Sequence, residues 1–233
     1  MTQDFSNEDV NERSNDIGVR LHNVHERIRA AATRAERDPA GITLVAVSKT
    51  VDAERIAAAA RAGQRVFGEN RAQELAAHAD AIDGDVEWHF IGRLQRNKVR
   101  SIARNVALWQ SVDRDELVPE LAHRAPGARV LVQVNVGDEP QKGGCTPAAT
   151  AQLVDTARTA GLRVEGLMTV PPAATDPRPF FAQLRDLGGQ LGLPELSMGM
   201  SSDFEAAVAE GATIVRVGSA IFGPRPAAAD TRR

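Results

Sequence analysis

Lys49 is the side chain in this sequence with the clearest capacity for covalent chemistry. It follows the apolar run 42–47 and, in an extended strand, shares a side with Val45 and Val47. A lysine at a strand end can snorkel to solvent, and that is one interpretation of Lys49. If the side chain instead points inward, desolvation lowers the pKa of its amine, which becomes a nucleophile towards aldehydes.

Two short turns near the end of the sequence carry the hydroxyl groups and backbone donors that suit an anion. Ser201 and Ser202 stand where a helix is expected to begin, and Gly218 and Ser219 follow an apolar run. Unpaired N–H groups at helix starts bind phosphate, and barrel enzymes frequently place a phosphate between two such loops. The alternative for the first turn is a capping box between Ser202 and Glu205, which needs no ligand.

Arg216 is a charged residue inside the apolar segment 213–217, on the side opposite its two neighbouring valines. A buried guanidinium needs a compensating partner. A carboxylate such as Glu165 is one candidate, and an anion or ring nitrogen of a ligand is the other. An amine for an aldehyde, a phosphate cradle and an arginine for a pyridine nitrogen together predict pyridoxal 5′-phosphate (PLP), held as a Schiff base on Lys49.

These residues need a scaffold that brings the ends of distant strands together. Several apolar runs lack the alternation of a half-exposed sheet, which indicates a parallel sheet covered by helices. The predicted strands are 42–47, 65–67, 87–91, 108–112, 130–136, 163–169, 195–198 and 213–217. The predicted helices are 17–37, 53–62, 71–81, 94–104, 115–123, 148–160, 176–191 and 203–210. We expect Asp52 and Asn70 to cap the second and third helices.

Strand and helix alternate eight times, which predicts an α/β fold with a single (β/α)8 TIM-type barrel, an extra N-terminal helix and no C-terminal β-domain. A doubly wound sheet is the alternative. The barrel domain is expected to span 16–223, between flexible tails over 1–15 and 224–233. In a barrel the site forms at the C-terminal ends of the strands, which is where Lys49 and the two turns fall.

The composition fits this fold and excludes several classes of function. The 233 residues suit one barrel, and 42% hydrophobic with 25% charged residues is ordinary for a globular protein. A net charge of -3 argues against a broad nucleic-acid footprint, and no apolar run approaches the ~20 residues of a membrane span. Cys145 is the single cysteine, and with no signal sequence recognised we expect a cytoplasmic protein without a metal site.

Seven blocks of sequence resemble the PLP homeostasis proteins (the YggS/PROSC family), whose barrel is similar to that of alanine racemases. The blocks are 46–50, 67–70, 88–92, 94–98, 166–168, 196–201 and 215–223. The resemblance implies that Lys49 is the Schiff-base lysine and that Arg216 lies near the pyridine nitrogen. It implies phosphate contacts around Ser201, Ser202, Gly218 and Ser219, and a cofactor pocket lined by Asn70, His89 and Met168. His89 has the alternative of a purely structural role.

The resemblance leaves a carrier and an enzyme to be separated. A racemase needs two bases on opposite faces of its substrate, and alanine racemases take the second from a tyrosine of a partner subunit. This sequence contains no tyrosine and ends just after the predicted barrel. We therefore expect a monomeric carrier of PLP that serves intracellular homeostasis, passes the cofactor to apo-enzymes and has no catalytic residue. A weak PLP-dependent amino-acid racemase is the alternative.

Overall fold

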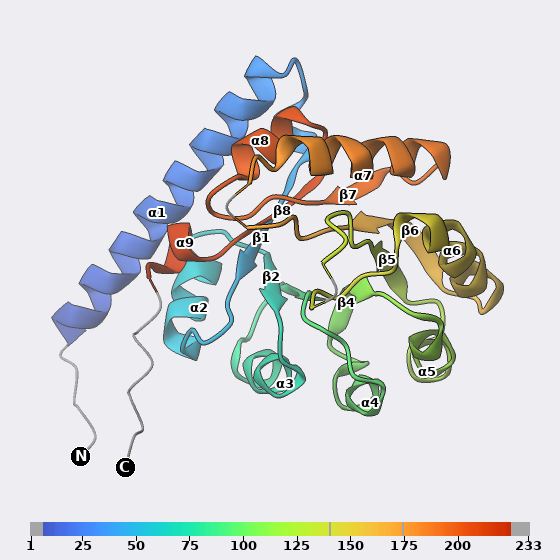
Figure 1. Ribbon diagram of the computed structural model, residues 1–233. Helices are drawn as coiled ribbons and strands as arrows, with labels where there is room; N and C mark the ends of the chain where they lie inside the picture. The colour runs from blue at the N-terminus through green and yellow to red at the C-terminus, as the bar shows by residue number, and fades with distance from the viewer. Residues whose placement is uncertain (1–6, 140, 174, 225–233) are drawn as a thin grey trace, which may run out of the picture.

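Eight parallel strands close into a barrel with helices around its outside (Figure 1). The structure is a computed structural model that describes residues 7–139, 141–173 and 175–224. The strands are β1 (Thr43–Val47), β2 (Val66–Glu69), β3 (Glu87–Phe90), β4 (Val106–Val112), β5 (Arg129–Gln133), β6 (Arg163–Met168), β7 (Glu195–Ser197) and β8 (Ile214–Val217). Each predicted strand is present, with ends shifted by a few residues.

The closure between β1 and β8 decides between the two predicted topologies. β1 pairs with β2 on one side and with β8 on the other, where Val45 lies opposite Arg216. A doubly wound sheet would leave open edges, so the (β/α)8 barrel is confirmed and the alternative is wrong. All the strands described up to residue 224 belong to this barrel, and no further domain lies among the described residues.

Helices follow the strands around the outside. They are α1 (Asn7–Arg34), α2 (Ala53–Arg61), α3 (Ala72–Ala81), α4 (Val99–Ile102), α5 (Val118–Arg124), α6 (Thr150–Thr159), α7 (Arg178–Gln190), α8 (Phe204–Ala209) and α9 (Ser219–Phe222). The predicted helix 94–104 is a 3-10 turn, Arg96–Lys98, followed by the single turn of α4. No helix of the described ranges is long and apolar enough to cross a membrane.

The long helix α1 lies across one side of the barrel against α2, α8 and α9 (Figure 1). Its apolar stripe, which includes Leu21, Val24 and Ile28, is buried there. The helix begins at Asn7, ten residues before the predicted start, so a tail over 1–15 is wrong for 7–15. The polar and acidic sequence of 7–15 has no apolar period from which a helix could be predicted. Residues 1–6 and 225–233 of the predicted tails lie outside the described residues.

The core has two parts. The larger one lies between the strands and the surrounding helices, as expected for a sheet buried on both faces. The smaller one fills the middle of the barrel with inward-facing side chains of five strands: Val45, Leu108, Leu131, Met168 and Ile214. This apolar cluster fills the barrel below its C-terminal end, beneath the place where a barrel site forms.

Candidate functional site

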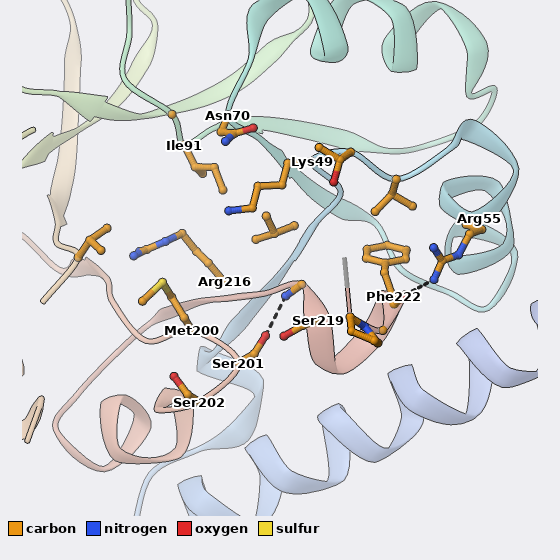
Figure 2. A pocket seen from close by; sticks show the side chains of 18 residues that line it. Lys49, Arg55, Asn70, Ile91, Met200, Ser201, Ser202, Arg216, Ser219 and Phe222 are labelled. Carbon is orange, nitrogen blue, oxygen red and sulfur yellow. Dashed lines mark hydrogen bonds between the residues drawn. The ribbon is translucent and has the colours of Figure 1, made fainter. Parts of the chain in front are cut away.

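A cavity of about 480 Å³ opens at the C-terminal ends of the strands (Figure 2). Its wall includes seven of the predicted site residues: Lys49, Asn70, Ser201, Ser202, Arg216, Gly218 and Ser219. It also includes residues that sequence reasoning did not single out, among them Thr50, Arg55, Met200 and Phe222. Residues from both ends of the sequence therefore meet in one space, because the barrel closes β8 onto β1.

Lys49 stands in the turn between β1 and α2. The half-buried side chain extends into the cavity between Asn70 and Arg216 (Figure 2). The next residue, Thr50, has a φ of 60°, and its N–H donates to a carboxylate oxygen of Glu74 at 3.3 Å. A β-branched residue in this left-handed region costs about 1–3 kcal/mol and persists only where the surroundings enforce it. The turn thus aims Lys49 at the cavity at the expense of local strain.

A buried polar group lies behind Lys49, on the outer side of the strands. Ser48 donates to the carboxylate of Glu69 at 2.6 Å, and Nδ1 of His78 lies 2.9 Å from the same oxygen. Glu69 is fully buried, and this burial raises the pKa of its carboxyl group. These contacts join the ends of β1 and β2 to α3, which fixes the backbone that carries Lys49. Sequence analysis did not predict this group.

Asn70 does not cap α3, contrary to the prediction. The N-cap position is Arg71, which makes no capping bond through its side chain. Asn70 instead lines the cavity, and its buried Oδ1 has no hydrogen-bond partner among the described groups. A buried amide oxygen normally has a partner, so this atom fits a polar group of a ligand in the cavity.

The two serine and glycine turns meet on one side of the cavity. The N–H of Gly218 donates to Oγ of Ser201 at 3.2 Å, which ties the turn after β8 to the turn after β7. The predicted capping box is wrong: α8 begins after Asp203, and Glu205 bonds Nε of Arg27 on α1 at 3.0 Å. The three serine hydroxyls of the two turns all border the cavity, and are those of Ser201, Ser202 and Ser219.

Arg216 enters the cavity wall from β8 and is 4% exposed. Nη1 donates to Oγ of Ser197 at 2.6 Å, and Nη2 donates to the carbonyl oxygen of Thr169 at 2.7 Å. The predicted partner Glu165 is wrong, because that carboxylate accepts from Nε of Arg129 at 2.9 Å, at the opposite end of the barrel. Burial lowers the pKa of Arg216 to about 10, so the side chain still carries its charge at neutral pH.

His89 and Met168 are the two predicted site residues that do not line the cavity. Met168 belongs to the apolar cluster in the middle of the barrel. His89 is 4% exposed, and its Nδ1 lies 2.8 Å from Nε2 of Gln110. Burial, together with the positive charge of Arg129, lowers the pKa of His89 to about 3. Both side chains face inward as expected, but one layer beneath the cavity. In the described ranges no group of three or more His, Cys, Asp or Glu could hold a metal ion.

Comparison with known proteins agrees with this architecture. Residues 19–226 match the family model of the alanine racemase N-terminal domain. A pyridoxal phosphate homeostasis protein of Aquifex aeolicus is 45% identical over 221 residues, which cover 88% of this chain and 97% of the relative. One from Pseudomonas aeruginosa is 43% identical over 220 residues, which cover 90% of this chain and 96% of the relative.

Solved structures show the same relationship. PipY of Synechococcus elongatus, in a structure with PLP bound, superposes with a TM-score of 0.76 and 35% identity over 89% of this chain and all of that chain (100%). Alanine racemase of Corynebacterium glutamicum superposes with a TM-score of 0.62 at 20% identity, over 89% of this chain and 62% of that chain. The second match shows a shared fold alone. With a family model matching most of its length and relatives above 40% identity, this chain belongs to the family of pyridoxal phosphate homeostasis proteins.

Proposed function

We propose that this protein binds PLP as a Schiff base on Lys49 and serves as a reversible carrier of the cofactor in PLP homeostasis. One observation carries the proposal: Lys49, Arg216 and the serine and glycine turns border a single cavity. Family membership supports it, since relatives bear the name of PLP homeostasis proteins and one neighbour contains PLP. When bound, PLP supplies an aldehyde that a lysine amine can hold covalently.

The residues of the cavity fit each part of PLP. The amine of Lys49 would take the aldehyde, and the hydroxyls of Ser201, Ser202 and Ser219 with the turn at Gly218 would hold the phosphate. Arg216 would donate to the pyridine nitrogen. The unpaired Oδ1 of Asn70 gives a further polar contact to a ligand. His89 and Met168 would act from beneath, through the residues that line the cavity.

The make-up of the wall favours a carrier over a racemase. Lys49 is the only described lining residue that could serve as the proton-transferring base of a racemase, since the wall has no His, Asp, Glu, Cys or Tyr. The sequence as a whole contains no tyrosine. A charged Arg216 beside the pyridine nitrogen also disfavours protonation of that nitrogen, which makes the ring a weaker electron sink. The described wall therefore provides no second base for proton transfer on the opposite face of a substrate.

Borohydride reduction of the PLP-loaded protein, followed by peptide mass mapping, tests ligand and lysine together. We expect one pyridoxyl adduct, on Lys49. In the Lys49→Ala variant the visible absorbance of the Schiff base should disappear, while Lys98→Ala, changed outside the cavity, should keep it. Visible absorbance that persists in Lys49→Ala would overturn the covalent assignment. Turnover of alanine enantiomers at the rate of a true racemase would overturn the carrier role.

Transfer is the part of the proposal that concerns partners. We propose that PLP-requiring apo-enzymes receive the cofactor, that the carrier is a monomer, and that it acts in the cytoplasm. A single cysteine in the sequence supports a reducing compartment. The test is to mix the PLP-loaded carrier with an apo-enzyme and a scavenger of free PLP. Recovery of enzyme activity despite the scavenger supports direct transfer, and loss of recovery contradicts it.

A further inference from the structure

A row of buried polar side chains crosses the inside of the barrel from Arg216. Nη1 of Arg216 donates to Oγ of Ser197 at 2.6 Å, and Oγ of Ser197 donates to Oε1 of Gln110, also at 2.6 Å. Nε2 of Gln110 lies 2.8 Å from Nδ1 of His89. The four residues come from β8, β7, β4 and β3, and none is more than 4% exposed. We call them the Arg216 chain.

The donors and acceptors of the Arg216 chain can be arranged in only one order. A guanidinium has donors alone, so Ser197 must accept from Arg216 and turn its own hydrogen towards Gln110. The Gln110 atom facing Ser197 must then be the carbonyl oxygen, which leaves the NH2 group to donate to His89. Nδ1 of His89 is therefore an acceptor without a proton, and a neutral imidazole then carries its proton on Nε2.

The surroundings of His89 agree with this neutral tautomer. Burial and the charge of Arg129 both lower the pKa of this imidazole. Its Nε2 lies 3.9 Å from a carboxylate oxygen of Glu87, an acceptor at the N-terminal end of the same strand. Thus one ring nitrogen meets a donor and the other faces an acceptor.

The Arg216 chain explains how a charged arginine is held in the wall of the barrel. No ion pair of Arg216 is found among the described residues: the carboxylate of Asp203 acts on its charge from a distance, and the direct contacts of the guanidinium are with neutral dipoles. Ser197 holds one terminal nitrogen and the carbonyl oxygen of Thr169 holds the other. These two contacts leave further N–H groups of the guanidinium available to the cavity.

We propose that His89, Gln110 and Ser197 are positioning residues: His89, with no proton on Nδ1, holds the Gln110 amide, and Gln110 through Ser197 holds the guanidinium of Arg216. This inference deepens the proposed function and rests on it for the role of Arg216 towards PLP. The Arg216 chain is present in the protein without the cofactor. An experiment can therefore reject the Arg216 chain and the proposed function independently. It also gives a function to His89, which lies beneath the cavity.

The first test is ¹⁵N NMR of the imidazole of His89 in the protein without PLP. We expect a proton on Nε2, none on Nδ1, and no titration from about pH 5 to about pH 9. The Gln110→Glu variant is expected to move the proton to Nδ1, because a carboxylate can only accept from both Ser197 and His89. A proton on Nδ1 in the wild type, or an unchanged tautomer in Gln110→Glu, overturns the inferred order.

The second test measures PLP affinity in folded variants. Ser197→Ala and Gln110→Leu should each raise the dissociation constant about tenfold, the scale of a lost hydrogen bond to a charged group. Gln110→Glu should restore affinity to near the wild-type value, because it again offers Ser197 an acceptor. The matched control is Gln133→Leu, which removes an inward glutamine that bonds the carbonyl oxygen of Gly143 instead.

The results of these tests distinguish a failure of the positioning role from a failure of the proposed function. Unchanged affinity in both Ser197→Ala and Gln110→Leu, or an equal loss in Gln133→Leu, overturns the positioning role. If Gln110→Leu does not fold, Ser197→Ala and Gln110→Glu decide the question alone. If the wild type takes up no PLP, the proposed function fails, and the tautomer of His89 still tests the chain.

Discussion

Gly92 lies directly against the backbone of Asn70: a β-carbon on Gly92 would stand 2.1 Å from the carbonyl oxygen of Asn70. The segment after β3 is thereby pressed onto the end of β2. This contact sets where the side chain of Asn70 meets the cavity, and no residue larger than glycine fits without movement of the backbone. The shape of one part of the wall thus depends on a missing side chain.

Gly92→Ala should therefore destabilise the protein by about 1–3 kcal/mol, the usual range for overpacking at a tight site. It should also weaken PLP binding by displacing Asn70. Urea unfolding gives the first quantity and an absorbance titration with PLP the second. The control is Gly41→Ala, where the added carbon meets nothing within 4 Å and we expect a change within about 0.5 kcal/mol. Equal stability of the two variants would contradict the prediction.

Thr50→Gly should relieve the backbone strain beside Lys49. Glycine adopts the φ of 60° at no steric cost, which offsets the entropy that it adds to the unfolded chain. We expect stability within about 1 kcal/mol of the wild type, or above it, and slower formation of the Schiff base, because the turn no longer fixes Lys49. Stopped-flow absorbance after mixing with PLP measures that rate. A rate equal to that of the wild type would show that the strained turn does not position the lysine.

Ser201→Ala should separate recognition of the phosphate from recognition of the ring. Because Ser201 joins the two turns through Gly218, we expect the dissociation constant for PLP to rise about tenfold. The constant for pyridoxal, which has no phosphate, should stay within about twofold of the wild-type value. Ser101→Ala removes an exposed hydroxyl that bonds Lys98 on the outside of the barrel and should change neither. An equal loss of affinity for PLP and for pyridoxal would show that Ser201 does not act through the phosphate.

Glu69→Gln should change how stability depends on pH. Burial raises the pKa of Glu69, so the folded protein keeps this proton at pH values where the unfolded chain has lost it. The free energy of unfolding therefore falls as pH rises from the unfolded pKa towards the raised folded pKa. Glutamine removes this titration.

The check is urea unfolding at a series of pH values from about 4 to about 8. The stability of Glu69→Gln relative to the wild type should rise with pH across the window. Glu116→Gln, at an exposed carboxylate, should run parallel to the wild type. If the difference in the free energy of unfolding between Glu69→Gln and the wild type stays constant with pH, burial does not raise the pKa of this carboxyl group.

The barrel could be predicted from the sequence because its strands are short apolar runs at regular spacing. The inward direction of Lys49 and Arg216 followed from the alternation of side chains along a strand. The depth at which an inward side chain lies in the barrel could not be predicted in the same way. Alternation places His89 inside the barrel, but the stagger between strands decides whether it lies at the cavity or one layer below.

Partners were harder to predict than positions. Arg216 was a candidate partner for Glu165, and Glu205 was one for Ser202. In the structure Glu165 bonds Arg129 and Ser202 borders the cavity. Asn70 has the residue type of a helix cap, yet its side chain is turned into the wall of the cavity. The choice between such partners depends on contacts between distant segments, which composition and spacing do not contain.

The apolar cluster in the middle of the barrel affects how a ligand enters and leaves the cavity. Val45, Leu131 and Met168 fill the interior beneath the cavity that Lys49 borders, so packed side chains separate this cavity from the N-terminal end of the barrel. We therefore expect PLP both to enter and to leave at the C-terminal end of the barrel. If PLP-requiring apo-enzymes receive the cofactor as proposed, a protein that supplies PLP and one that receives it would contact the same end of the barrel one after the other.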